Sequence, residues 1–481
     1  MVTLSAARAF ALPMALLLTL AGAACGGGEK ASPPAAAPLI LRPATANLLV
    51  GTGATFTATA PDGSPRPVTF RIREGATGGT LTAGGAYLAP PKAGTYHVVA
   101  AAVDDPSQVA EAVVTVRDYA NQVQRLPDAP EAFDLGTATP LPGGQLLLTG
   151  GRGLDGRVRT RALRFDPSTG TFTPTGSLSR ARFAHTATRL PDGRVLIAGG
   201  DDPTVPFDPF RPALSSSELY DPRTEAFTPG PALTVPRFHH GATPLADGRI
   251  LLSGGLQIAG SSGFGASPNT EVFDPATGTF TATGRMTAQG RWLHTATLLE
   301  DGRVLLVGGR DTSCTTNCTA HSLSSAELFD PATGTFTATG SLSISRYRHT
   351  ATRLPDGRVL ILGGETTEEL GTGTDQVRLA ELYDPATGTF TPLGNLALAR
   401  GNHTATLLPH GKVLIMAGES ISGVPTTATE LLDPLTGGTT AGPELAETHL
   451  RAHALRLDSG EVLLLGGSNG YQPTAVMERF R

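Results

Sequence analysis

The chain has 481 residues, of which 59 are glycine and 38 are proline, and 40% of it is hydrophobic against 16% charged. This composition excludes a disordered chain, which has few apolar residues and many charges, and it favours turn-rich β structure. The net charge of −5 provides no basic footprint, so nucleic acid is excluded as an expected partner.

The first 24 residues have the pattern of a bacterial secretory signal peptide. The apolar run from Ala9 to Leu20 is too short for a retained membrane span, and small residues follow it. The ending LAGAAC, followed by GGGEK, resembles a lipoprotein signal in which Cys25 carries the lipid. This resemblance implies an exported, membrane-anchored lipoprotein at the outer membrane or cell surface, with plain secretion as the alternative. Residues 25–38 are rich in Gly, Ala and Pro and predict a flexible linker.

Residues 39–117 alternate short β-rich runs, such as PVTFRI and EAVVTV, with clusters of turn residues. Runs of this length and spacing predict an antiparallel β-sandwich. The sequence segments GAYLAP and AGTYHVVA resemble those of bacterial immunoglobulin-like domains. The resemblance places Tyr96 where such domains have a corner-forming tyrosine, and it implies a spacer or weak adhesion module.

One phrase recurs through the rest of the chain: LPDGRVLIAGG from Leu190, LEDGRVLLVGG from Leu299 and LPDGRVLILGG from Leu354. It belongs to seven units that follow one another at intervals of 49 to 55 residues. The first glycine of the Gly-Gly pair is Gly150, Gly199, Gly254, Gly308, Gly363 and Gly466, and Ala417 replaces it in the sixth unit. A period of about fifty residues with four β segments predicts a β-propeller.

Turn residues divide each unit into four strands. HTATRL and RVLIAGG flank a PDG turn, and SSAELFD and FTATG flank the turn DPATG, whose Asp, Pro and Gly suit successive turn positions. The last unit ends after a third strand, TAVMERFR, and residues 119–126 precede the first unit without a sheet of their own. We therefore expect strand 119–126 to complete the last blade and close a propeller over 119–481.

Several of these features resemble the kelch repeat: paired glycines after the second strand, a third strand ending in [FY]DP and a large residue opening the fourth. The motif DGRVL…GG is most similar to the repeats in the propeller of galactose-oxidase-type proteins. The resemblance covers about 360 residues, three quarters of the chain. It implies an all-β protein with a seven-bladed kelch propeller, preceded by the immunoglobulin-like β-sandwich.

The same resemblance raises the question of copper-radical chemistry, which in galactose oxidase needs two tyrosines, two histidines and a cysteine crosslinked to one tyrosine. No Tyr-His pair occurs in a late blade, and the propeller cysteines, Cys314 and Cys318, share one loop. In an exported protein such a pair predicts a local disulfide, with a metal site that includes His321 as the alternative. Sequence motifs of other enzymes, GxSxG, HExxH and the P-loop, are also missing. We therefore expect no cofactor and no metal.

Histidine, arginine and glutamate recur from unit to unit. The histidines are predicted to share one position before the TAT strand: His185, His240, His294, His349, His403 and His453. Five follow an arginine by three residues, namely Arg182, Arg237, Arg291, Arg346 and Arg400, and the third strands carry Glu218, Glu271, Glu327, Glu381, Glu430 and Glu478. Because a catalytic site needs unlike groups, we interpret these residues as scaffold, with His bonded to a backbone carbonyl and Arg to a neighbouring blade's Glu. A metal- or anion-binding crown at the channel mouth is the alternative.

The residues between each Arg and His differ among the blades and face the same side as the long loops after the Gly-Gly pairs. They supply the candidate ligand-binding residues Phe183, His239, Trp292, Tyr347, Arg348 and Asn402. Unlike loops on one face of a rigid ring are a common binding surface, and exposed aromatics with Arg and Asn can hold a sugar or a peptide. Alternatively, the aromatics fill gaps between blades. We predict a non-catalytic surface protein that binds a glycan or a protein, with a carbohydrate-active oxidase or lyase as the alternative.

Overall fold

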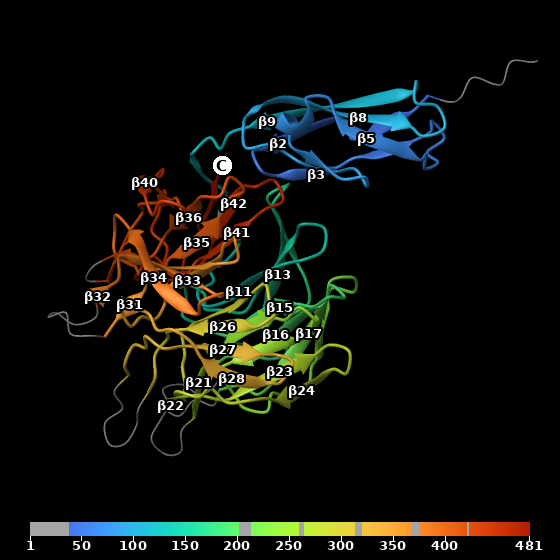
Figure 1. The fold of residues 1–481 in the computed structure, drawn as a ribbon. Helices are drawn as coiled ribbons and strands as arrows, with labels where there is room; N and C mark the ends of the chain where they lie inside the picture. Colours follow the sequence, from blue (N-terminus) through green and yellow to red (C-terminus); the bar gives the residue numbers. More distant parts are fainter. Residues whose placement is uncertain (1–37, 202–212, 259–263, 313–319, 368–374, 421–422) are drawn as a thin grey trace, which may run out of the picture.

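The computed structural model describes residues 38–201, 213–258, 264–312, 320–367, 375–420 and 423–481. They form an N-terminal β domain and a ring of seven four-stranded sheets (Figure 1). Their helical elements include the 3₁₀ turn Gly75–Gly78, and no helix in these ranges is long and apolar enough to cross a membrane. The lipidation prediction at Cys25 and the disulfide prediction at Cys314 and Cys318 fall outside the described residues.

The N-terminal domain consists of two sheets and a short ladder around one hydrophobic core. Its strands are β1 (Ile40–Arg42), β2 (Thr45–Leu49), β3 (Gly53–Thr55), β4 (Thr57–Thr59), β5 (Val68–Ile72), β6 (Thr80–Leu81), β7 (Ala86–Leu88), β8 (Gly94–Ala102) and β9 (Val109–Arg117). The sheets have the orders β2-β9-β8-β5 and β3-β7-β6, and β1 pairs with β4. Phe56, Tyr87 and Val114 pack in the core. Tyr96 donates its hydroxyl to the carbonyl of Lys92, four residues earlier, at 3.0 Å.

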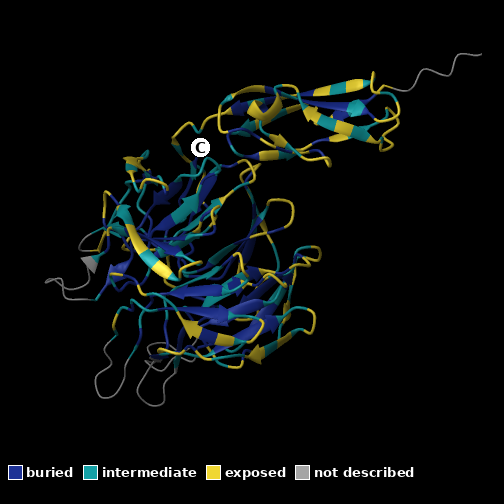
Figure 2. Ribbon diagram, viewed as in Figure 1, coloured by how far each residue is buried: buried dark blue, intermediate teal, exposed yellow. Residues whose placement is uncertain are grey.

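Each propeller blade is an antiparallel sheet, and the first strands of successive blades contact one another around the axis. From blade 1 to blade 7 the first strands are β11 (Thr137–Pro140), β15 (Thr186–Arg189), β19 (Gly241–Pro244), β25 (Thr295–Leu298), β29 (Thr350–Arg353), β35 (Thr404–Leu407) and β41 (His453–Arg456). The second strands are β12 (Leu146–Thr149), β16 (Val195–Ala198), β20 (Ile250–Ser253), β26 (Val304–Val307), β30 (Val359–Leu362), β36 (Val413–Met416) and β42 (Val462–Leu465). Every residue of the second strands is buried, because both faces of the strand pack on neighbouring blades (Figure 2). This double burial explains the uninterrupted apolar runs in the sequence.

The outer half of each blade is more exposed. The third strands are β13 (Ala162–Asp166), β17 (Ser217–Asp221), β23 (Thr270–Asp274), β27 (Ala326–Asp330), β33 (Leu379–Asp384), β39 (Glu430–Leu432) and β43 (Met477–Phe480). The fourth strands of blades 1 to 6 are β14 (Thr171–Pro174), β18 (Ala226–Pro229), β24 (Thr279–Ala282), β28 (Thr335–Ala338), β34 (Thr389–Asn395) and β40 (Thr439–Ala441). Short hairpins extend three loops: β21 (Leu256–Ile258) with β22 (Phe264–Ala266), β31 (Glu365–Thr366) with β32 (Asp375–Gln376), and β37 (Glu419–Ser420) with β38 (Val424–Pro425).

The outer strand of blade 7 comes from the beginning of the propeller. β10 (Val123–Arg125) pairs antiparallel with β43, so that Val123 faces Phe480 and Arg125 faces Glu478. This strand lies within residues 119–126, the segment that we expected to complete the last blade and close the ring. The pairing covers the edge of β43 and joins the two ends of the ring.

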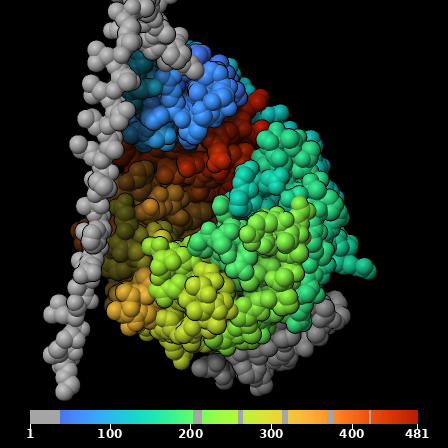
Figure 3. Space-filling view, turned by 90° about the vertical axis from the view of Figure 1, so that its right-hand side faces the viewer, coloured from blue at the N-terminus to red at the C-terminus, as the bar shows by residue number. Residues whose placement is uncertain are grey.

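The two faces of the propeller differ in the kind of chain connections that lie on them. The turn face holds the tight turns within each blade, and the loop face holds the connections between blades and those between second and third strands. The N-terminal domain contacts the turn face at blades 6 and 7 (Figures 1 and 3), where Tyr119 donates its hydroxyl to the carbonyl of Gly460 at 2.8 Å. A Cβ added at Gly51 would lie 2.6 Å from the carbonyl oxygen of Pro409, so the two backbones approach closely. The loop face is therefore directed away from this contact.

Candidate functional site

Three positions in each blade surround the axis on the loop face. The mouth position has positive φ and holds Leu135, Ala184, His239, Leu293, Arg348, Asn402 and Arg451. The bridge position, one residue earlier, holds Asp134, Phe183, Phe238, Trp292, Tyr347, Gly401 and Leu450. It pairs with the post-glycine position, which holds Arg152, Asp201, Leu256, Arg310, Glu365, Glu419 and Ser468. Positive φ is uncommon outside glycine, and here hydrogen bonds between neighbouring mouth residues hold it, as from His239 N to Ala184 O at 3.0 Å.

Close packing between blades explains the Gly-Gly pair that precedes these positions. Gly150 has a φ of +63°, and a Cβ there would lie 2.5 Å from the carbonyl oxygen of Arg182 and 2.8 Å from the His185 ring of the next blade. Any side chain at this position would therefore displace the imidazole. Ala417 occupies the position in blade 6, where the next blade has Ala452 in place of the histidine and leaves room for the methyl group.

The repeated histidines bind hydroxyl groups rather than the backbone carbonyls that we expected. His240 Nε2 lies 2.9 Å from the Thr186 hydroxyl of the preceding blade, and His349 Nε2 lies 2.9 Å from that of Thr295. The equivalent bonds of the other three rings run to hydroxyls of Thr149, Ser253 and Thr350. Burial, followed by nearby guanidinium charges, lowers the pKa of each ring, to about 3 for His294 and for His403. These imidazoles are neutral parts of the scaffold.

His453 does not share the position of the other five histidines, so that prediction is wrong. It is the first residue of β41, where blade 2 has Thr186 as the first residue of β15. Ala452 stands in the histidine position of blade 7. The His453 ring instead lies 3.0 Å from the carbonyl oxygen of Gly136 in blade 1. The one-residue offset was hidden because His453 precedes a similar apolar pattern, ALRL instead of TATRL.

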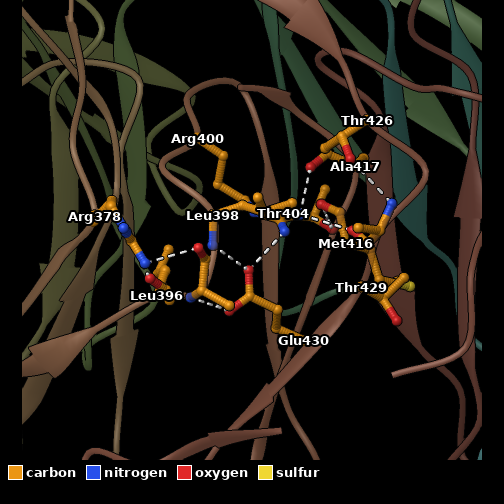
Figure 4. A network of polar contacts seen from close by, with 12 residues as sticks. Arg378, Leu396, Leu398, Arg400, Thr404, Met416, Ala417, Thr426, Thr429 and Glu430 are labelled. Atoms are coloured by element: carbon orange, nitrogen blue, oxygen red, sulfur yellow. Dashed lines mark hydrogen bonds and ion pairs between the residues drawn. The ribbon is translucent and has the colours of Figure 1, made fainter. Parts of the chain in front are cut away.

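Each repeated arginine forms a buried ion pair within the blade that it enters, not with a neighbouring blade as we expected. The Nη2–carboxylate distances are 2.9 Å for Arg182–Glu218, 3.0 Å for Arg237–Glu271, 2.8 Å for Arg291–Glu327, 2.5 Å for Arg346–Glu381 and 2.7 Å for Arg400–Glu430. Figure 4 shows the network of blade 6, in which Glu430 also accepts the backbone N–H groups of Ala397 and Leu398. In blade 7, His449 replaces the arginine and contacts Glu478 at 3.2 Å. Removing one member of such a pair would leave a buried charge, which is strongly destabilising.

Three of the six candidate ligand-binding residues, Phe183, Tyr347 and Asn402, are buried instead of exposed. Phe183 is 4% exposed and lies under the guanidinium of Arg152, whereas Tyr347 is 1% exposed and lies under that of Arg310. These two rings therefore fill gaps between blades, which was the alternative interpretation. Asn402 is 9% exposed, and His239, Trp292 and Arg348 are partly exposed.

The surroundings of the mouth are apolar on one side. Phe183, Ala184, Phe238 and Leu256 pack together in blades 2 and 3, and the neighbouring Leu135 and Trp292 extend this cluster. The ring of Trp292 lies 5.9 Å from that of His239.

The opposite side of the mouth is charged. Arg348 Nη1 binds Glu365 at 3.1 Å, and the amide of Asn402 bridges Glu365 at 3.1 Å and Glu419 at 2.5 Å. Glycine at position 401 makes this arrangement possible, since a Cβ there would lie 2.7 Å from the Glu365 side chain. Burial raises the pKa of Glu419, and the negative charge of Glu365 raises it further.

A cavity of about 250 Å³ opens at the mouth. Its lining includes Leu135, Ala184 and Leu293 on the apolar side, together with His239 and Arg451. Arg451 is fixed by Asp134, with Nε–Oδ1 and Nη2–Oδ2 distances of 3.1 and 3.0 Å.

The donor groups at the mouth do not fit the copper site that the galactose-oxidase resemblance implies. In the described ranges, no group of three or more His, Cys, Asp or Glu side chains could hold a metal ion. The Nε2 atoms of the repeated histidines already bind hydroxyl groups, and all three cysteines of the chain lie outside the described residues.

Sequence reasoning missed several residues that the structure brings to this face. Arg451, Asp134, Glu365 and Glu419 belong to the mouth, bridge and post-glycine positions, but only Arg348 and Asn402 of the charged side were selected. Tyr471 is 97% exposed in a loop of blade 7 on the same face. A signal was present in the residue that follows each Gly-Gly pair, because it differs in chemistry from blade to blade.

Comparison with known proteins agrees with the architecture. A stretch of 136 residues is 35% identical to Kelch-like protein 33 of Homo sapiens, covering 28% of this chain and 24% of that protein. A stretch of 293 residues is 27% identical to galactose oxidase of Gibberella zeae, covering 46% and 40%. The chain thus spans less than half the length of these curated relatives.

Solved structures share the fold at low identity. A fungal alcohol oxidase in complex with copper superposes with a TM-score of 0.58 at 18% identity over 75% of each chain. No family model matches the sequence. The seven four-stranded sheets and these similarities together make the chain a seven-bladed β-propeller, similar in sequence repeat and fold to the propellers of kelch and galactose-oxidase-type proteins.

Proposed function

We propose that this protein is a non-catalytic binding protein that holds a glycan through the loop face of its propeller. One observation carries the proposal. The positions that repeat from blade to blade form buried scaffold bonds, whereas the mouth, bridge and post-glycine positions vary among the blades, and five of the mouth residues line a cavity. Unlike side chains on a rigid ring, around a partly apolar cavity with few polar groups, are the usual composition of a ligand site.

A surface location is part of the proposal. A lipid on Cys25, followed by the linker 25–38, would hold the chain at a membrane by its N-terminal end. The N-terminal domain contacts the turn face at Pro409 and Gly460. The loop face would therefore be directed away from the anchored end and toward external ligands. A protein ligand in place of a glycan is the second outcome that the test below separates.

The test is a glycan and peptide array probed with the full mature chain, followed by two matched variants. Trp292→Ala removes a partly exposed ring at the mouth, and Leu435→Ala removes a side chain that is 80% exposed on the turn face. We expect the first variant to lose at least half of a glycan signal and the second to retain it. A signal that both variants keep, or that neither array yields, would contradict a glycan site on the loop face.

An oxidase function is the competing proposal, since the sequence and fold resemble copper oxidases. Copper loading of the purified protein, followed by metal analysis, separates the two. One tightly held copper per chain would overturn the binding-only function, and copper that dialysis removes would support it.

A further inference from the structure

The mouth cavity contains one histidine that differs from its neighbours. His185, His240 and His294 line the cavity and bind hydroxyl groups of the scaffold, but the His239 ring makes no hydrogen bond to a residue in the described ranges. We propose that this cavity binds a sugar acid, whose carboxylate contacts Arg451 and whose ring hydroxyl contacts His239. The inference rests on the proposed glycan-binding function and specifies its ligand class.

His239 offers an unused donor and an unused acceptor. Burial, followed by the charges of Arg348, Arg451 and Arg152, lowers its pKa to about 4, so the ring is neutral near pH 7. A neutral imidazole has one N–H and one free lone pair, which suits a hydroxyl group that both donates and accepts. The charges of these three guanidiniums disfavour a proton on the ring, although Asp134 and Glu365 pair with two of them.

Arg451 is positioned for a carboxylate. Asp134 holds its Nε and Nη2 atoms at 3.1 and 3.0 Å, and the Nη1 atom makes no hydrogen bond to a described residue. The ion pair therefore fixes the direction of the guanidinium and leaves one NH₂ group for a ligand. A charge-assisted bond from a fixed guanidinium is among the stronger polar contacts, and its planar donors match carboxylate geometry.

The size and walls of the cavity indicate a single sugar ring. A cavity of roughly 150 Å³ holds a benzene molecule in another protein, so the volume of about 250 Å³ here accommodates a substituted six-membered ring. Leu135, Ala184 and Leu293 supply the apolar part of the lining, with His239 between Ala184 and Leu293 in blade order and Arg451 in the blade next to that of Leu135. A pyranose has an apolar C–H face and a polar edge, which fits a lining that contains both apolar side chains and a few polar groups.

Isothermal titration calorimetry with four ligands tests the parts of this proposal separately. The full mature chain at low salt is titrated with galacturonate, glucuronate, galactose and cyclohexanecarboxylate. We expect both uronates to bind at least tenfold more tightly than galactose, which lacks the carboxylate, and than cyclohexanecarboxylate, which lacks the hydroxyls. We also expect uronate binding to weaken as NaCl is raised. Equal affinity for galactose would overturn the carboxylate assignment, and equal affinity for cyclohexanecarboxylate would overturn the sugar assignment.

Residues at the same position in other blades indicate which substitutions the backbone can accept. Leucine occupies the mouth position in blades 1 and 4, so His239→Leu and Arg451→Leu retain a backbone that leucine already adopts with positive φ. Arg451→Leu is combined with Asp134→Asn, because Asp134 is 6% exposed and would otherwise be left as a buried charge. The control is Arg189→Leu, an exposed arginine on the turn face whose position holds Leu298 in blade 4.

We expect the double variant to weaken uronate binding at least tenfold, His239→Leu to weaken it about fivefold, and the control to change it less than twofold. Unchanged uronate affinity in the double variant, with a melting curve like that of the parent protein, would overturn the inference. If neutral glycans bind the loop face while uronates do not, only this inference fails. If the parent protein binds neither uronates nor any arrayed glycan, the proposed function fails with it.

Discussion

Acid should destabilise the propeller steeply, because its buried histidines are neutral. His294 and His403 have their pKa lowered to about 3, chiefly by burial, and that of His185, His240 and His349 is lowered well below its usual range. In the unfolded chain each ring has a pKa of about 6.5 and takes up a proton below that pH, while the folded protein does not. Their contribution is therefore complete above pH 6.5 and is lost as the pH falls from 6.5 toward 3.

The size of this effect follows from proton linkage. Each ring removes about 1.4 kcal/mol of unfolding free energy per pH unit below 6.5, so five rings together remove about 7 kcal/mol per pH unit. A typical domain has about 5–15 kcal/mol of stability in total. We therefore expect the propeller to unfold within about two pH units below 6.5, before most carboxylates are protonated.

Urea denaturation at pH 7.5, 6.5 and 5.5 measures this slope, and His403→Gln tests its origin, because His403 is 6% exposed. Glutamine can still bind the Thr350 hydroxyl but does not titrate, so between pH 6.5 and 5.5 the variant should lose about 1 kcal/mol less than the parent protein, because the unfolded ring is already half protonated at pH 6.5. A variant whose stability falls with pH as steeply as that of the parent protein would show that the acid sensitivity arises elsewhere.

Three further changes test the packing of the ring. Ala452→His should destabilise the protein by about 1–3 kcal/mol in urea denaturation, because the new ring meets the Ala417 methyl group; Ala417→Gly in the same chain should recover most of the loss, and two additive effects would refute the contact. Tyr347→Ala should cost about 3 kcal/mol in the same assay because the ring is buried, and an unchanged midpoint would mean that the ring is exposed in solution. Replacing residues 119–126 by a Gly/Ser linker of equal length should lower the Tm by about 5 °C or more, and an unchanged Tm would contradict closure through β10.

The fold could be predicted because its determinants repeat. A single turn signal such as PDG is weak evidence, but seven aligned copies fix the strands, their order and the number of blades. The second strands were recognisable since their four consecutive apolar residues are buried on both sides, as in Val195–Ala198. The repeated apolar pattern therefore indicates which strands are buried in the closed ring.

The contacts between blades could not be predicted in the same way. Whether His240 binds a backbone carbonyl or the Thr186 hydroxyl depends on how far one blade is displaced relative to the next, and no periodicity encodes this displacement. The burial of Phe183 and Tyr347 depends on Arg152 and Arg310, which follow other Gly-Gly pairs and cover the rings only after folding. The partner of Arg451, Asp134, lies 317 residues away at the other end of the ring.

Departures from the repeat are of two kinds, and the difference between them identifies the functional surface. Ala417 and Ala452 depart together in scaffold positions, and each compensates for the other by filling or vacating the same space. His239 departs in a mouth position, and its ring gains no hydrogen bond to a described residue in return. Selection for folding explains the first kind, because the packing is restored. It does not explain a partly exposed imidazole that makes no scaffold bond and lines the same cavity as a guanidinium fixed by Asp134, and a ligand that uses both groups does.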